Sequence, residues 1–331
     1  MDTKGWSEYI FDSSISFTER CLEVYRFQKE KNQLYNLFSG ALGYTGATLA
    51  GPEAIPLLPI RAFNQGIISV DGVSHQVVFK SSGTSGMNQS SHFIHDIKIY
   101  KRAINREFFT HFPDKNYALI CYMPGYRDNP NSSLILMAQY LISRDRSGLA
   151  TFWENSDFNP GKWEEQVNKN GKIPLLFGAA FGLLDIIENG KSPFSGPVEI
   201  IETGGMKTFK REITKEQLRK KLSEGFCIPQ GSIHSEYGMC ELLSQMYAIG
   251  DEWFTAPNWV WVTIRDPENP RRICNPGEEG KIGIIDLANV YSCPFILTDD
   301  RGVADESGRF KVLGRWNIDD PRGCNFLIDR D

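Results

Sequence analysis

The stretch VVFKSSGTSGMNQSSH, residues 77–92, joins an apolar run to a segment rich in hydroxyl side chains and glycine. Six Ser or Thr residues and two glycines lie within residues 81–91. Residues 77–79 are predicted to form a buried strand, and the apolar spacing over residues 96–112 predicts an amphipathic helix soon afterwards. A glycine-rich turn between a strand and a helix gathers backbone N–H groups around a phosphate. No Gly-Lys-Ser/Thr follows, so a nucleotide-phosphate loop and a polar surface turn suit this stretch equally well.

The bulk composition predicts a globular protein without a nucleic-acid partner. The chain has 331 residues, 41% of them hydrophobic, and a formal net charge of −5, which gives no electrostatic reason to expect nucleic acid. Seven widely spaced cysteines without a C-x-x-C pair favour reduced thiols over disulfides or a zinc site. The N-terminus has no continuous apolar run, and the most apolar segment, residues 173–187, is too short to span a bilayer. A cytoplasmic protein without integral membrane association is therefore expected.

The chain is expected to divide into three parts. Strands alternate with helices up to residue 250, which predicts an α/β core with a parallel sheet and ligands at the carboxyl ends of its strands. Residues 251–315 contain short strands separated by Pro, Gly and Asn turns, a pattern typical of antiparallel hairpins. Residues 316–331 are expected to form a hinge and a short remnant.

A second candidate stretch is IHSEYGMCELLSQ, residues 233–245, which we predict to begin a helix. It places Glu236 and Glu241 on either side of Tyr237-Gly238. A carboxylate at this point would suit a magnesium ion, and an aromatic ring would stack on a base. An ordinary helix start with acidic residues in its first turn is the alternative.

A third candidate stretch, LTDDRGVADESGRFKVLGRW, follows at residues 297–316. Asp299 and Asp300 come directly after one predicted strand, and Gly314-Arg315 comes after the next. A carboxylate accepts hydrogen bonds from ribose hydroxyls, and an arginine pairs with phosphate. A pair of solvated hairpin turns is the alternative. His92 and His95, in HFIH, lack further ligands at metal spacing, so zinc is not expected there.

These three stretches, in this order, resemble the motifs of the adenylate-forming superfamily of acyl-CoA synthetases. SSGTSG resembles its phosphate loop, YGMCE its Y-G-x-T-E motif, and LTDDRG with GRFKVLGRW its ribose-binding and hinge motifs. The resemblance runs over about residues 77–325. Within the superfamily the chain is similar to the acyl-protein synthetase (LuxE-type) branch, related to phenylacetate-CoA ligases, because RGCNFLI at residues 322–328 resembles the end of that branch.

The resemblance implies ATP and Mg²⁺ as cofactors and assigns the residues that would bind them. The residues implied at the nucleotide are Ser81, Ser82, Gly83, Thr84, Ser85, Gly86, Gly204, Gly205, Tyr237, Gly238, Asp300 and Arg315. In the Ser/Gly loop between residues 81 and 90, residues 82–86 would close over the β- and γ-phosphates. The two glycines at 204 and 205 would lie along the adenine, and Tyr237 would stack on it. Asp300 would hold the ribose with support from Arg315. The residues implied in catalysis are Thr84, Glu241 as the Mg²⁺ ligand, and Cys324 as the acyl acceptor.

The chain departs from the superfamily pattern at three points. Cys240 stands where the larger family has a threonine, and no lysine follows the Gly-rich loop. The chain ends at Asp331, soon after Arg315, so the mobile C-terminal domain with its catalytic lysine is expected to be absent. For Cys324 the alternative to an acyl acceptor is a buried thiol ahead of an apolar run.

The function implied by the resemblance is ATP-dependent activation of a carboxylic acid, expected to be a fatty acid, to an acyl-adenylate, with transfer to a thiol. The partners implied are the acid, an acyl-donor or acyl-acceptor protein, and coenzyme A. Two alternatives stay open. One is an AMP-forming acyl-CoA or aryl-CoA ligase that acts with a separate C-terminal domain. The other is a non-catalytic nucleotide- or acyl-binding subunit.

Overall fold

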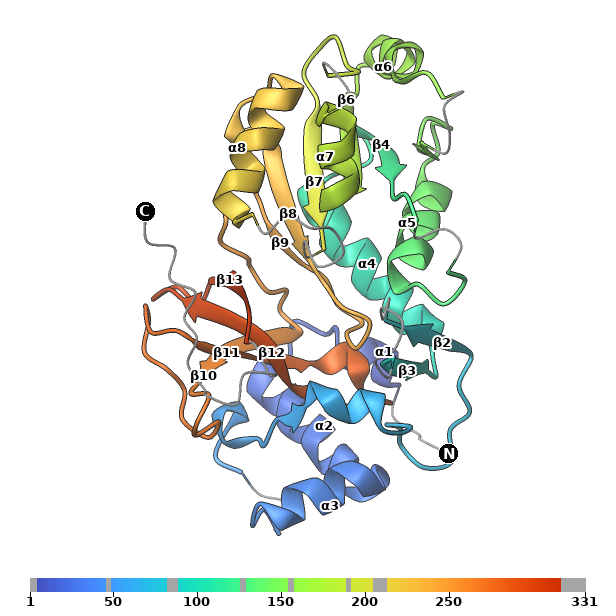
Figure 1. Ribbon diagram of the computed structural model, residues 1–331. Helices are drawn as coiled ribbons and strands as arrows, with labels where there is room; N and C mark the ends of the chain where they lie inside the picture. The colour runs from blue at the N-terminus through green and yellow to red at the C-terminus, as the bar shows by residue number, and fades with distance from the viewer. Residues whose placement is uncertain are drawn as a thin grey trace.

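Two large β-sheets, one above the other in Figure 1, organise the described part of the chain in this computed structural model, and a third sheet has two strands. The structure describes residues 5–45, 49–81, 89–125, 129–153, 158–188, 192–204 and 213–316. The upper sheet has the strand order β5-β4-β6-β7-β8-β9, and all neighbouring pairs are parallel except β8 with β9. Its strands are β4 (Tyr117–Tyr122), β5 (Thr151–Phe152), β6 (Ile173–Ala179), β7 (Glu199–Thr203), β8 (Ile233–Tyr237) and β9 (Met246–Ala248).

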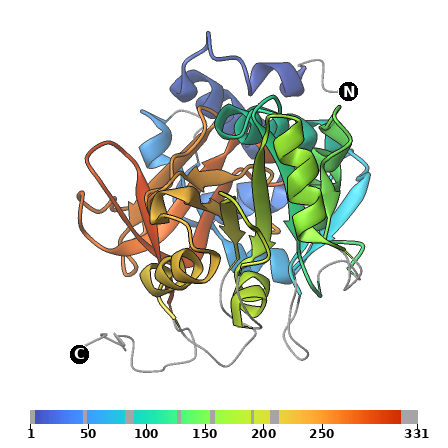
Figure 2. The same ribbon diagram turned by 90° about the horizontal axis from the view of Figure 1, so that it is seen from above.

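Helices cover both faces of the upper sheet, as Figures 1 and 2 show. Alternating side chains of one strand belong to different cores, since Leu175 and Phe177 face one side and Leu176 the other. The first core includes α4 (Ile97–His111) and α5 (Ser133–Arg144). The second includes α6 (Pro160–Lys169), α7 (Ala180–Glu188) and α8 (Lys215–Phe226). Near-continuous apolar strands are therefore needed here, as in other parallel sheets.

The lower sheet is mainly antiparallel. Strands β10, β11, β12 and β13 pair in sequence order, and the short β1 pairs parallel to β12. The bounds are β1 (Leu58–Pro59), β10 (Val260–Arg265), β11 (Gly280–Asp286), β12 (Phe295–Ala304) and β13 (Phe310–Arg315). Both expected parts, a parallel α/β layer and an antiparallel β subdomain, are confirmed.

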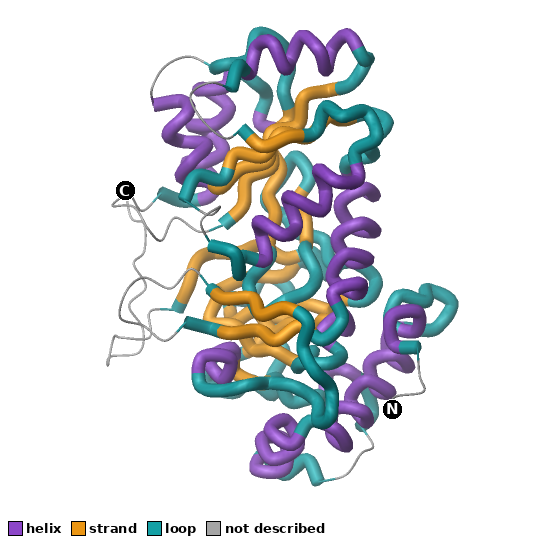
Figure 3. The backbone as a smooth tube through the Cα atoms, turned by 90° about the vertical axis from the view of Figure 1, so that its right-hand side faces the viewer, coloured by secondary structure: helices purple, strands orange, loops and turns teal. Residues whose placement is uncertain are grey.

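The N-terminal helices pack against the lower sheet rather than the upper one, as Figures 1 and 3 show. They are α1 (Trp6–Tyr9), α2 (Phe17–Lys31) and α3 (Gln33–Ala41), and the single turns are η1 (Pro52–Ala54), η2 (Ile60–Asn64), η3 (Gln230–Ser232) and η4 (Leu287–Asn289). Buried Tyr25 and Tyr35 contact the ring of Phe295 on β12, with centroids 6.0 and 5.1 Å away. Helices α2 and α3 thus share a core with the lower sheet, and the division at residue 250 stays a prediction.

The strand before the Ser/Gly loop lies outside the parallel sheet. Strand β2 (Val77–Lys80) pairs antiparallel with β3 (Ser91–Ile94), and α4 follows after β3. The expected strand–loop–helix order is therefore wrong: the loop joins the two strands of a hairpin. Val77 and Val78 are only half-buried, because β2 has no neighbour other than β3 among the described strands.

The stretch 233–245 begins as a strand, and the predicted helix start is wrong. Residues Ile233–Tyr237 form β8, which is buried along its length, and a loop then reverses the chain into β9. All five residues of β8 are buried, so successive side chains on both faces of the strand are covered and the extended form is selected. The next upstream helix, α8, begins with a capping box in which Thr214 and Gln217 satisfy each other's backbone N–H groups.

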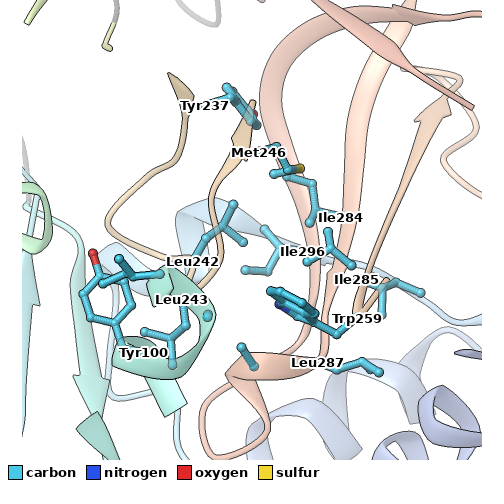
Figure 4. Close-up of a cluster of buried hydrophobic side chains, with 14 of the residues drawn as sticks. Tyr100, Tyr237, Leu242, Leu243, Met246, Trp259, Ile284, Ile285, Leu287 and Ile296 are labelled. Atoms are coloured by element: carbon cyan, nitrogen blue, oxygen red, sulfur yellow. The ribbon is translucent and has the colours of Figure 1, made fainter. Parts of the chain in front are cut away.

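The loop after β8 connects the cores of the two sheets. Figure 4 shows Leu242 and Leu243 between Tyr100 of α4 and Ile296 of β12. Both leucines are at most 5% exposed. Burying two leucine side chains contributes on the order of 3–6 kcal/mol, so the loop is held firmly between the sheets.

Arg219 of α8 binds backbone carbonyls around the start of β8, and its loss is expected to lower the stability of the fold. It is 4% exposed, and its guanidinium donates to the carbonyls of Ile233, Asp251, Gln230 and Gly250 over 2.7–3.0 Å. Arg219→Met would leave these carbonyls without donors, so the free energy of unfolding in urea should fall by about 3 kcal/mol.

The matched control for this change is Lys220→Met, on the exposed side of the same helix. It should change the unfolding free energy by no more than about 0.5 kcal/mol. Equal unfolding midpoints for the two variants would contradict the role given to Arg219.

Within the described ranges, no helix has both the length and the apolar composition required to cross a membrane.

Candidate functional site

The carboxyl ends of β7 and β8 lie side by side and form one part of the candidate site. Thr203 and Glu236 are register partners on these parallel strands. Each strand is followed by a predicted glycine, Gly204 and Gly238. Gly204 has φ +85°, a left-handed conformation that favours glycine. A Cβ at Gly238 would lie 2.5 Å from Oε1 of Glu236, so any side chain there would force the Glu236 carboxyl group to move.

Three predicted residues, Tyr237, Asp300 and Arg315, form a hydrogen-bonded chain between the two sheets. The Tyr237 hydroxyl donates to Oδ2 of Asp300 over 2.8 Å. Nε of Arg315 donates to Oδ1 of the same carboxylate over 2.9 Å. Burial raises the pKa of the Tyr237 phenol, with the carboxylate of Asp300 adding to the effect. The phenol therefore stays protonated and donates to the carboxylate.

Local strand geometry decides which of the two neighbouring aspartates faces Tyr237. Asp300 on β12 pairs in register with Arg315 on β13, which brings their side chains together. Asp299 points to the opposite face, where Arg61 and Lys281 pair with it at 3.1 and 3.3 Å. Successive side chains alternate across a strand, so only one of the two acids reaches the site.

Glu241 lies in the loop after β8 and is 6% exposed. Burial raises the pKa of its carboxyl group, while a hydrogen bond from Ser90 and the positive charge of Arg315 lower it. Its backbone carbonyl accepts from Nδ2 of Asn289 over 2.8 Å. Glu241 is thus a buried acid held beside the end of the Ser/Gly loop.

Ser81 and Ser90 close the base of the Ser/Gly loop. The amide of Ser81 donates to the carbonyl of Ser90 over 3.1 Å, and the Ser90 amide donates to the Ser81 hydroxyl over 3.0 Å. Since Ser90 also contacts Glu241, the loop begins and ends next to that acid. Seven predicted site residues lie outside the described ranges: Ser82, Gly83, Thr84, Ser85, Gly86, Gly205 and Cys324.

Glu236 is a feature of the site to which sequence reasoning gave no separate role. It is 5% exposed, and the Thr203 hydroxyl donates to its Oε2. Burial raises the pKa of Glu236 to about 7, the Thr203 hydrogen bond and Lys215 lower it, and Glu202 raises it. Its position in an apolar-flanked strand was the available signal, because a charged residue is rarely buried without a partner.

His92 and Asn289 were also missed as contacts of this loop. His92 was considered only as a zinc ligand, yet it is 1% exposed on β3 and contacts the carbonyl of Cys240 over 2.9 Å. In the part of the chain that is described, no group of three His, Cys, Asp or Glu residues is arranged to hold a metal. No local sequence pattern predicts these contacts, since His92 and Asn289 lie far in sequence from the loop residues that they bind.

Most cysteines in the described ranges are poorly suited to nucleophilic chemistry. Burial raises the pKa of the thiols of Cys21, Cys121, Cys240 and Cys293, which keeps them protonated and weakly nucleophilic. Cys227 is exposed at the end of α8, away from the loops described above. Cys240 lies directly before Glu241, but as a thiol it is a weak hydrogen-bond donor.

Solved structures similar to this chain share an adenylate-forming fold. The crystal structure of an open conformation of 2-hydroxyisobutyryl-CoA ligase with 2-HIB-AMP and CoA matches with TM-score 0.66 and 12% identity, over 90% of this chain and 69% of that one. ATP-bound MatB from Rhodopseudomonas palustris matches with TM-score 0.50 and 15% identity, over 72% of this chain and 47% of that one. At these identities the likeness concerns the fold. No curated protein sequence matches the chain.

A family model also matches the chain, and it covers the larger part of the site just described. The family is "Acyl-protein synthetase, LuxE", and the match extends over residues 172–331. It includes Tyr237, Glu241, Asp300 and Arg315, which lie on β8, the following loop, β12 and β13. The expected class, an AMP-forming ligase, agrees with both the family and the fold. Over residues 172–331, slightly less than half of its length, this chain is thus similar to the LuxE acyl-protein synthetase family.

Proposed function

We propose that the protein activates a fatty acid with ATP and passes the acyl group to a thiol, with Cys324 as the first acceptor. The carboxylate oxygen of the acid would attack the α-phosphorus of ATP, forming acyl-adenylate and releasing pyrophosphate. A thiolate would then attack the acyl carbon and release AMP. The observation that carries the proposal is the Tyr237–Asp300–Arg315 chain, which lies close enough to Glu241 for the charges of Asp300 and Arg315 to act on its carboxyl group.

The charges and donors of these residues fit a nucleotide. Asp300 keeps acceptor capacity on both oxygens after binding Tyr237 and Arg315, since an ionised carboxylate has about four acceptor sites. Both ribose hydroxyls could therefore donate to it. Gly204 has no side chain, so a flat base would have room along the backbone at the end of β7.

Glu241 fits a magnesium ion that arrives with ATP. Mg²⁺ is usually held by one or two carboxylates together with substrate phosphates, so a single buried acid suffices. When bound, the ion would neutralise charge on the phosphates. Within the chain, Glu241 would hold the ion, Ser90 would orient its carboxylate, and Arg315 would offset negative charge beside the ribose.

Acid-dependent ATP–pyrophosphate exchange tests the activation step. Exchange should appear with one class of acid, and a screen of aliphatic, aromatic and amino acids should rank medium or long aliphatic acids first. Absence of exchange across that panel would reject the ligase and favour the nucleotide- or acyl-binding alternative. Exchange that is stronger with aromatic acids would retain the ligase but reject the fatty acid.

Mass spectrometry after incubation with acid and ATP tests the acceptor. A hydroxylamine-labile acyl adduct should appear on Cys324, and Cys324→Ser should abolish it while exchange continues. The second candidate acceptor is coenzyme A, which the structure of 2-hydroxyisobutyryl-CoA ligase contains. An unmodified Cys324 together with acyl-CoA formed on addition of coenzyme A would favour that candidate.

A further inference from the structure

The backbone around Glu241 is fixed by two side chains that come from distant parts of the chain. The carbonyl of Cys240 lies 2.9 Å from Nδ1 of His92, and the carbonyl of Glu241 accepts from Nδ2 of Asn289 over 2.8 Å. These carbonyls flank the Cα of Glu241 on consecutive peptide units. Fixing both of them restricts the two backbone dihedrals that aim the Glu241 side chain.

The tautomer of His92 follows from its two partners. A carbonyl only accepts hydrogen bonds, so Nδ1 must carry the proton that binds the Cys240 carbonyl. Nε2 then accepts from the Ser292 hydroxyl, 2.8 Å away, a shorter contact than the 3.3 Å from that hydroxyl to the carbonyl of Asn289. Burial lowers the pKa of His92 to about 4, so the ring is neutral near pH 7.

Ser292 and Asn289 belong to a segment that is itself anchored. Asn32 at the start of α3 donates to the carbonyl of Ser292 over 2.8 Å, and Gln28 of α2 donates to the carbonyl of Val290 over 2.7 Å. All four side chains are at most 2% exposed. The segment therefore offers a rigid support against which the imidazole of His92 is held.

We propose that His92 is a positioning residue for Glu241, with its Nδ1–H fixing the Cys240 carbonyl and Ser292 fixing the tautomer. The inference rests on the proposed function, in which Glu241 holds the metal that accompanies ATP. His92 also lies on β3, one residue beyond Ser91 and two beyond Ser90, so it ties the Ser/Gly hairpin to the loop that carries the acid. Partners that orient a metal ligand typically change metal affinity 10–100-fold when they are lost.

Two substitutions distinguish the roles of the two ring nitrogens of His92. The amide nitrogen of Asn in His92→Asn takes the place of Nδ1 and keeps a donor for the Cys240 carbonyl. His92→Gln places its amide near Nε2, keeps the contact with Ser292, and loses the donor. The probe is Mn²⁺ with ATP and no acid, so that no turnover occurs, and free Mn²⁺ is followed by electron paramagnetic resonance.

Wild type and His92→Asn should bind Mn²⁺ within about threefold of each other, whereas His92→Gln should bind about tenfold more weakly. The KM for Mg²⁺ in pyrophosphate exchange should follow the same order. His95→Gln is the matched control, because His95 is a buried histidine whose ring bonds to Ser69 rather than to the Cys240 carbonyl. It should leave Mn²⁺ binding unchanged.

Equal Mn²⁺ affinity of His92→Asn and His92→Gln would overturn the inference, as would weakening by the Asn variant alone. If His92→Gln does not fold, Ser292→Ala replaces it: the ring stays, its tautomer is no longer fixed, and Mn²⁺ affinity should fall severalfold. Unchanged affinity in Ser292→Ala would then reject the inference. Failure of the proposed function is distinguishable, because wild type would then show neither ATP-dependent Mn²⁺ binding nor exchange.

Discussion

Glu241→Gln should lower acid-dependent ATP–pyrophosphate exchange by roughly 10²–10³-fold, the range found when one electrostatic contact to a transition state is removed. Glutamine has nearly the size of glutamate and keeps an oxygen beside the Ser90 hydroxyl. It carries no charge to hold Mg²⁺ beside the phosphates. The measurement is the exchange rate at saturating ATP and acid, over a series of Mg²⁺ concentrations.

An exposed acid serves as the control for this variant. Glu306→Gln removes one negative charge from the hairpin between β12 and β13 and should leave exchange within about twofold of wild type, since surface charges away from a site have small effects. Urea unfolding of Glu241→Gln should show a cooperative transition, which excludes loss of fold. Exchange at wild-type level in a folded Glu241→Gln would remove this residue from the proposed metal site.

Glu236→Gln should make the protein more stable than wild type at alkaline pH. The pKa of Glu236 in the folded protein is raised from 4.5 to about 7, chiefly by burial. A group with a raised folded pKa supplies its full stability below its unfolded pKa, and this stability is lost as the pH rises toward and through the folded value. Glutamine does not ionise and escapes the loss. The difference in unfolding free energy between variant and wild type should therefore grow by about 3 kcal/mol from pH 4.5 to pH 8.

Several charged or ionisable groups act on Glu236 and must remain in place for this comparison. Thr203 donates to it, while Glu202 and Lys215 act through their charges. On the other side of β8, Tyr247 of β9 is the register partner of Glu236. Urea unfolding at several pH values measures the effect, with the exposed Glu216→Gln as control. A difference that is constant with pH would show that Glu236 ionises normally.

Some features of the fold were determined by local sequence. The helices over α2, α3, α4 and α5 follow from apolar spacing, and the capping box at Thr214 fixes the start of α8. Hairpin turns made the antiparallel sheet predictable after residue 250. In each case the signal lies within one element, where propensity, spacing and turn chemistry agree.

Other features were decided only by tertiary contacts. The segment 233–237 carries charged and polar residues that suit a helix start, yet it forms a strand because neighbours on both sides bury it. The Ser/Gly loop joins a hairpin rather than a strand and a helix, since β3 pairs with β2 across it. Helix α2 packs on the lower sheet, whose strands β10–β13 lie far from it in the sequence, so no local sequence pattern predicts this contact.

The candidate site divides in the same way. Its residue types and their order along the chain came from the sequence, as did the choice of Asp300, through motifs at residues 81–86, 237–241 and 297–316. Only the tertiary structure joined Tyr237 to Asp300, separated Asp299 onto the other face, and set His92 and Asn289 against the loop of Glu241. The physical reason is that a motif specifies chemistry locally. Burial, register and the partners of a side chain depend on segments that meet only when the two sheets pack together.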